Sequence, residues 1–150
     1  IDRLNEIKSS GRIFFTVGNM EYLKHGGRIG KVASVAGSLL GIKPIITLKE
    51  GEIFPSGIGR SRRKTVDKTI DLLLAYLAEE KADIADYSIC IGYGYDKEEA
   101  VEFRDRLVSR LKEKGYDIDT IPIFQIGATI GVHTGPYPLG IGVVKKSIRE

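Results

Sequence analysis

The segment GATIGVHTGPYPLGIGVV, residues 127–144, contains His133, one of two histidines in the 150-residue chain. Glycine has no side chain, so a histidine among glycines can reach a ligand that bulkier neighbours would block. Thr129 and Thr134 add hydroxyl groups close by in the sequence. An imidazole with two hydroxyls suits a carboxylate or a carbonyl group. On these residues alone, a ligand contact and a structural histidine are equally good interpretations of His133.

Two other segments combine glycine with basic side chains. HGGRIGK, from His25 to Lys31, could form an anion site, because backbone N–H groups and the Arg28 guanidinium could converge on an oxyanion. It matches neither the phosphate loop nor the dinucleotide-binding fingerprint, and a tight turn with a surface arginine is the simpler interpretation. GRSRRK, from Gly59 to Lys64, could hold phosphates or a partner's acidic face, or could be a solvated basic loop.

The composition excludes several classes of function. The net charge of +3 is too small to indicate nucleic acid as a partner, and no aromatic residues interrupt GRSRRK as a nucleic-acid site would favour. One cysteine and no Cys/His spacing of the metal-binding kind argue against disulfides and a zinc site. The acidic residues fall on the polar faces of two expected helices, so no isolated carboxylate pair indicates acid–base catalysis. Without an apolar run of roughly 18 residues or a visible signal peptide, we expect a cytoplasmic protein with no transmembrane segment.

Alternating strand and helix patterns must position these residues. Apolar residues at helical spacing predict long helices at 64–82 and 96–115, and Asp96 three residues before Glu99 indicates the start of the second. Short helices are expected at 19–27 and, from small residues that allow close packing, at 31–41. Strands are expected at 12–17, 43–48, 52–55, 87–94, 119–127 and 139–144, with a turn at 49–51.

This order predicts a single α/β domain over residues 1–150, with a mixed β-sheet and flanking helices. Parallel pairing is expected between the strands at 87–94 and 119–127, and antiparallel pairing at the hairpin near Gly51. The chain begins without methionine, in what resembles the end of a helix. We therefore expect it to be part of a larger protein.

Two long motifs resemble the DegV family of bacterial fatty-acid-binding proteins, which includes the binding subunit of fatty-acid kinase. MEYLKHGGRIGKVASVAGSLLGIKPIITLKEGEI is similar to the family's G-G-R-I segment, small-residue helix and I-K-P-I strand, and GATIGVHTGPYPLGIGVV to its closing H-T-G-P-G segment. The resemblance covers nearly all of the chain but only the C-terminal half of a family member. The family's N-terminal half, which supplies a serine and a threonine to the lipid carboxylate, is absent. Tyr137 stands where the family usually has glycine.

The resemblance implies a lipid carrier and not an enzyme, with no cofactor and no metal. It implies that a long-chain fatty acid is buried in an apolar slot and that its carboxyl group is presented to a separate ATP-dependent kinase, which forms an acyl phosphate for phospholipid synthesis. His133, Arg28 and Thr134 would contact the carboxylate, and Arg60 and Arg62 would face the kinase. The slot would be lined by Ala33, Ala36, Leu39 and Leu40, although close helix packing explains these residues equally well.

Two other classes of function stay open from the residues. One is an enzyme that acts on a small carboxylated or phosphorylated substrate with His133 as its base. The other is a regulatory or nucleic-acid module that acts through the basic loop Arg60 to Lys64.

Overall fold

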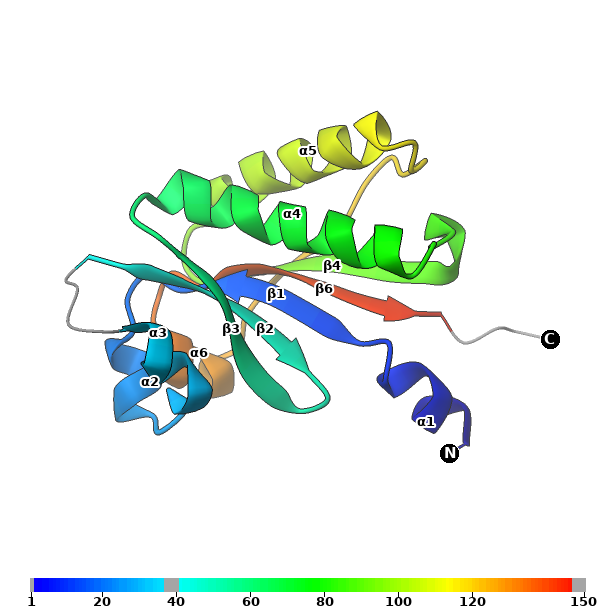
Figure 1. Ribbon diagram of the computed structural model, residues 1–150. Coiled ribbons are helices and arrows are strands. Elements are labelled where there is room, and N and C mark those ends of the chain that lie inside the picture. The colour runs from blue at the N-terminus through cyan, green and yellow to red at the C-terminus, as the bar shows by residue number, and fades with distance from the viewer. Residues whose placement is uncertain (1, 37–40, 147–150) are drawn as a thin grey trace.

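A six-stranded mixed sheet forms the centre of the computed structural model, which describes residues 2–36 and 41–146 (Figure 1). The strand order is β3-β2-β1-β6-β4-β5. The strands are β1 (Arg12–Thr16), β2 (Lys43–Lys49), β3 (Glu52–Gly59), β4 (Tyr87–Tyr93), β5 (Ile123–Gln125) and β6 (Leu139–Lys145). Neighbouring strands run antiparallel except β4 and β5, which are parallel. The expected mixed α/β fold is therefore confirmed, with the Pro122-containing segment at the sheet edge.

The helices divide between the two faces of the sheet (Figure 1). The long helices α4 and α5 cover one face, while α2, α3 and α6 lie together on the opposite face and α1 lies near the other end of the strands. The helices are α1 (Asp2–Lys8), α2 (Glu21–His25), α3 (Ala33–Ala36), α4 (Arg62–Glu79), α5 (Lys97–Glu113) and α6 (Ala128–Thr134), with 3-10 turns η1 (Gly30–Val32) and η2 (Ile84–Asp86). Across the described ranges, no helix has the length and apolar character needed to cross a lipid bilayer.

The main hydrophobic core lies between the sheet and the two long helices. Residues at helical spacing on α4 and α5 turn toward the sheet and are buried there, including Val66, Ile70, Leu73, Leu77, Phe103, Leu107 and Leu111. Full burial of such a side chain contributes about 1.5–3 kcal/mol. The apolar stripes that predicted these helices therefore also hold them on the sheet.

A smaller cluster fixes α2 and η1 to the opposite face. Its buried members are Val17, Leu23, Val32 and Ile46, and Phe15 and Met20 pack against them. This cluster covers only one end of the strands, where β1 ends and β6 begins. At the other end of the same face, the nearby helix is α1, which lies beyond the start of β1 (Figure 1).

Side chains at the starts of the long helices confirm one expected boundary and correct another. Asp96 Oδ1 accepts the Glu99 N–H at 2.9 Å, so Asp96 caps α5 as expected. Ser61 Oγ accepts the Lys64 N–H at 3.2 Å and caps α4. The basic segment GRSRRK is therefore not a loop throughout, because its last three residues form the first turn of α4.

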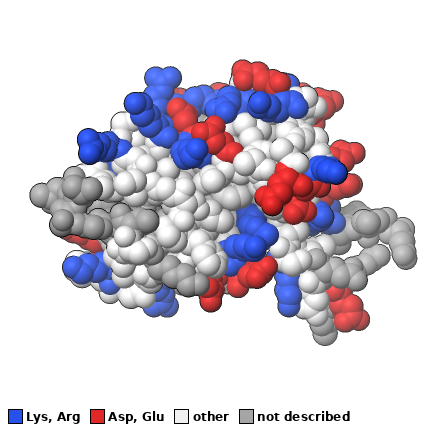
Figure 2. All heavy atoms as spheres, viewed as in Figure 1, with Lys and Arg blue, Asp and Glu red and all other residues white. Residues whose placement is uncertain are grey.

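Many charged side chains lie over α4 and α5. Figure 2 shows them along the top of the molecule, and others lie at its centre, its right-hand side and its lower edge. Some form ion pairs between the two helices: Arg110 with Asp71 at 2.9 Å, and Arg106 with Asp67 at 3.5 Å. The expectation that the carboxylates of these helices lie on their polar faces agrees with these positions.

Two segments differ from the sequence expectation. The glycine-rich segment before β6 forms a helix, α6. One internal glycine, Gly131, and two flanking glycines, Gly127 and Gly135, made this segment a poor helix candidate. The helix expected at 31–41 is represented by η1 and the four-residue α3, and residues 37–40 lie outside the described part of the chain.

Candidate functional site

The imidazole of His133 packs directly against a glycine of α2. His133 lies in the last turn of α6, and a Cβ atom added to Gly26, the residue that ends α2, would overlap its Nδ1 atom. That Nδ1 atom is buried and has no hydrogen-bond partner among the described residues. With one ring nitrogen enclosed in this way, Nε2 is the nitrogen left for a ligand.

The side chain of Arg28 is hydrogen-bonded to the same glycine, Gly26. Its Nη1 atom donates a hydrogen bond to the Gly26 carbonyl oxygen at 3.0 Å, and the side chain is otherwise exposed. The backbone N–H of Arg28 donates to the Leu23 carbonyl oxygen at 2.8 Å, which fixes the turn after α2. His133 and Arg28 are distant in sequence, and the structure places both side chains in contact with the same residue, Gly26.

Thr134 is the most buried of the three predicted head-group residues, with 6% of its surface exposed. Its hydroxyl donates to the Ile130 carbonyl oxygen, 3.2 Å away and one turn earlier in α6. The hydroxyl proton is thus already used within the helix, as is common for threonine in helices. Thr134 would have to rotate this proton away before it could donate to a carboxylate.

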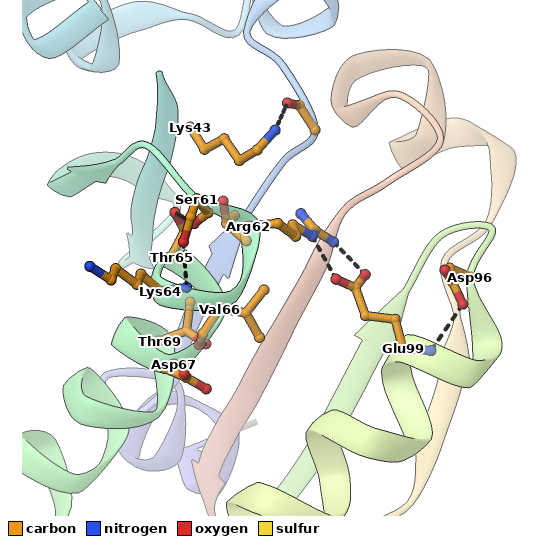
Figure 3. A network of polar contacts seen from close by, with 12 residues as sticks. Lys43, Ser61, Arg62, Lys64, Thr65, Val66, Asp67, Thr69, Asp96 and Glu99 are labelled. Atoms are coloured by element: carbon orange, nitrogen blue, oxygen red, sulfur yellow. Dashed lines mark hydrogen bonds and ion pairs between the residues drawn. The ribbon is translucent and has the colours of Figure 1, made fainter. Parts of the chain in front are cut away.

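A polar hollow of about 500 Å³ lies beside this contact, between α2, the segment after α6 and the starts of α4 and α5. Part of its wall is drawn in Figure 3, where Arg62 and Glu99 point toward each other across the gap between two helices. The residues that line it are Gly18, Asn19, Tyr22, Lys43, Arg62, Asp96, Glu99, Thr134, Pro136 and Tyr137. Cations and carboxylates are mixed in this lining, so the hollow is not a simple anion site.

Arg62, predicted to face a partner, is engaged within the domain. Its Nε and Nη2 atoms each donate to a Glu99 carboxylate oxygen at 2.8 Å, and the two side chains are 24% and 26% exposed (Figure 3). Its third nitrogen, Nη1, is buried without a partner among the residues described. Arg60 differs because its side chain is exposed. Of the two arginines, only Arg60 is placed to meet another molecule without breaking an ion pair.

An apolar hollow of about 880 Å³ lies at the other end of the sheet face that also carries α6, where Lys8, the last residue of α1, is part of its lining. The starts of β1 and β4 and the end of β6 form its floor, through Ile13, Ile89, Cys90, Gly142, Val143 and Val144, and Phe124 of β5 stands at its edge. Ile13 is 42% exposed and Phe124 60% exposed, large values for such apolar side chains. Its volume lies in the range of roughly 300–1,000 Å³ that is usual for small-molecule sites.

Strand β1 joins this apolar hollow to the region below α2. Side chains two residues apart on a strand share a face and lie about 6–7 Å apart. Ile13 lines the hollow, and Phe15 packs against the small cluster under α2. An apolar surface therefore runs along the strand from the hollow toward the end of the sheet where His133 lies.

Among the residues predicted to line an acyl slot, Ala33 does not contribute to this surface. Ala33 is exposed on α3 and lines neither of the two hollows. Ala36 is the last residue of α3, while Leu39 and Leu40 fall outside the described residues.

Tyr137, which replaces a glycine of the family pattern, has a structural place. A Cβ on Gly18 would lie 3.2 Å from the Tyr137 Cβ, so the tyrosine covers that glycine. Its ring meets the Tyr95 ring edge-on, with centroids 6.3 Å apart. Tyr137 thus closes one side of the polar hollow.

Sequence reasoning missed other residues of the polar hollow, notably Lys43, Asp96 and Glu99. Lys43 Nζ donates to the Gly18 carbonyl oxygen at 3.0 Å (Figure 3). These residues come from separate elements and only the tertiary packing places them together. Within residues 2–36 and 41–146, no three His, Cys, Asp or Glu side chains come together as a metal site would require.

Comparisons with known proteins agree with this fold. A family model described as "Uncharacterised protein, DegV family COG1307" matches residues 1–146. A DegV domain-containing protein of Clostridium perfringens is 35% identical over 150 residues, which cover 97% of this chain and 49% of that protein. The chain thus spans about half the length of the relatives it matches.

Solved structures give the same result. A stearic-acid-binding protein from Eubacterium ventriosum is 44% identical with a TM-score of 0.87, covering 97% of this chain and 48% of that one. A fatty-acid-binding DegV family protein from Thermus thermophilus is 27% identical with a TM-score of 0.79, at the same coverage. The family-model match over almost the whole chain, together with this shared architecture, shows that the chain belongs to the DegV family.

Proposed function

We propose that this chain forms part of a cytoplasmic protein that binds one long-chain fatty acid. The observation that carries the proposal is the pairing of two features on one sheet face: an imidazole with a buried, partnerless nitrogen at one end and an apolar hollow of about 880 Å³ at the other, both within the described residues. The fatty-acid-binding relatives from Eubacterium ventriosum and Thermus thermophilus support the same ligand class.

The chemistry of each end matches one part of a fatty acid. Burial of an acyl chain contributes about 0.8 kcal/mol per CH₂, so an apolar surface along β1 and β6 can retain a long tail. A carboxylate that leaves water needs charged or polar donors in exchange. Arg28 can supply a guanidinium fork and His133 its Nε2 atom, with Thr134 as a third contact once its proton turns.

The acyl tail has two proposed locations within the chain. The apolar hollow is one, and the small-residue segment with Ala33, Ala36, Leu39 and Leu40 is the sequence-based alternative. The hollow is the better candidate because large apolar side chains are left exposed around it, whereas Ala33 lines neither hollow.

We also propose that the bound carboxyl group is presented to a separate ATP-dependent kinase, so that this protein carries the lipid and its partner catalyses the formation of an acyl phosphate. Arg60 is the residue we expect to meet the kinase, because its side chain is exposed beside the start of α4. Arg62 contributes indirectly, by fixing α4 against α5 through Glu99.

The test is the lipid content of the full-length protein. We expect organic extraction and mass spectrometry to recover about one fatty acid per protein, and His133→Ala to lower the affinity for it about tenfold or more, as for loss of a hydrogen bond to a charged group. His25→Ala is the matched control, because His25 is exposed at the end of α2. A parent protein without lipid, or a His133→Ala variant that holds lipid as well as the parent, would contradict the proposal.

A further inference from the structure

Helices α2 and α6 meet through two contacts of the same kind, each between an aromatic ring and a glycine. His133 of α6 packs on Gly26 at the end of α2, and Tyr22 of α2 packs on Gly135 at the end of α6. A Cβ atom at either glycine would overlap the facing ring. Each helix thus contributes one ring and one glycine to a reciprocal contact.

The backbone conformation explains one of these glycines but not the other. Gly135 has φ +73°, a left-handed value that favours glycine whatever surrounds it. Gly26 has φ −76° and ψ 0°, ordinary helical values that any residue adopts. The requirement for glycine at Gly26 therefore comes from the space that the His133 ring occupies.

Gly26 also holds the second head-group candidate. Its carbonyl oxygen accepts the bond from Arg28 Nη1 at 3.0 Å, while its α-carbon supports the imidazole. A shift of this one residue would move both side chains that we expect at the carboxylate.

We propose that Gly26 is a positioning residue for the lipid head group, and that it acts by leaving room for the His133 imidazole and by orienting Arg28. The inference rests on the proposed function, since it assigns a role at that same site. A methyl group at position 26 would push the ring away from α2 and turn Nε2 out of its place. A second, milder contact of the added methyl, 3.0 Å from the Tyr22 carbonyl oxygen, needs only a small shift.

A double-mutant cycle in the full-length protein tests this role. Gly26→Ala should lower the retention of fatty acid about tenfold or more, as His133→Ala does, and should lower the melting temperature. In the His133→Ala background, where the ring is gone, Gly26→Ala should cause little further loss of fatty-acid retention and little further fall in the melting temperature. Such coupling is measured as non-additivity between the two substitutions.

The control is Gly131→Ala, on the same helix as His133, where an added Cβ meets nothing within 4 Å. Gly131→Ala should not lower the melting temperature, because alanine has a higher helix propensity than glycine. The inference is overturned if Gly26→Ala retains lipid like the parent, or if its effects persist in full without the His133 ring. A parent protein without fatty acid would refute the proposed function, while the melting temperatures would still decide whether Gly26 and His133 are coupled.

Discussion

Tyr76 of α4 illustrates how burial changes the chemistry of a single residue. It is only 8% exposed, and its hydroxyl donates to the Ser10 carbonyl oxygen at 2.8 Å. Burial is the largest cause that raises the pKa of Tyr76 to about 12, with Tyr87 and Glu80 adding to the effect and Arg12 opposing it. The neutral hydroxyl is therefore favoured in the folded protein.

This shift predicts a loss of stability in alkali. The unfolded chain releases the Tyr76 proton near pH 10, whereas the folded protein keeps it up to about pH 12, so the folded state binds more protons in that window and stability falls as the pH rises. Between pH 9 and pH 11 we expect Tyr76 to account for about 1.4 kcal/mol of lost unfolding free energy. Urea unfolding of the parent and of Tyr76→Phe at both pH values measures this difference. An equal loss in both proteins would show that Tyr76 is not responsible.

Among the head-group candidates, single residues were predictable to different degrees. His133 and Arg28 stand in motifs rich in glycine, and these motifs were enough to single out both residues. Gly26 lies in the same motif as Arg28, but nothing in the sequence shows that a ring from residue 133 lies over it. The family resemblance implied that Arg62 faces a partner, and in the structure its guanidinium binds Glu99.

At the scale of elements, the polar hollow depends on how α4 and α5 are held together. A bidentate ion pair, with two hydrogen bonds between Arg62 and Glu99, joins the first turns of the two helices (Figure 3). Positive side chains in the first turn of α4 oppose the helix dipole, and Glu99 offsets this for Arg62. The pair therefore stabilises a helix start that its own sequence disfavours.

We expect Arg62→Ala to lower the free energy of unfolding by about 1–2 kcal/mol, because charge-assisted bonds of a mostly buried side chain are lost. Glu99→Gln should cost less, because the amide keeps one oxygen to accept a bond from Arg62. Arg60→Ala is the control, and since its side chain is exposed it should change stability by less than about 0.5 kcal/mol. Denaturant titration of the three variants provides the comparison. If Arg60→Ala and Arg62→Ala were equally stable, the ion pair would have no structural role.

At the scale of the whole molecule, the sheet has one face fully covered and one face only partly covered. The long helices bury the first face, and the small cluster under α2 protects only one end of the second. The apolar hollow of about 880 Å³ at the remaining end is not explained by packing within the described residues. We assign it to the acyl tail under the proposed function.

Filling the hollow tests that assignment. Ser88 lines it from β4, so Ser88→Trp in the full-length protein should reduce bound fatty acid severalfold, because the indole would occupy space needed by the tail. Ser109→Trp is the matched control, since Ser109 is exposed on α5, on the other side of the sheet. Mass spectrometry of extracted lipid reads out both variants. Equal lipid content in the two would place the tail elsewhere and favour the segment around Ala33.

The sequence by itself determined the helices α4 and α5, the strands and the mixed character of the sheet, because these depend on local periodicity and on turn residues. It also singled out His133 and Arg28, since both lie in long motifs. Only the tertiary structure decided that α6 is a helix, that Gly26 must lack a side chain, and that Arg62 binds Glu99. Each of these results depends on contacts between residues far apart in the chain, and such contacts leave no pattern in the residues next to them.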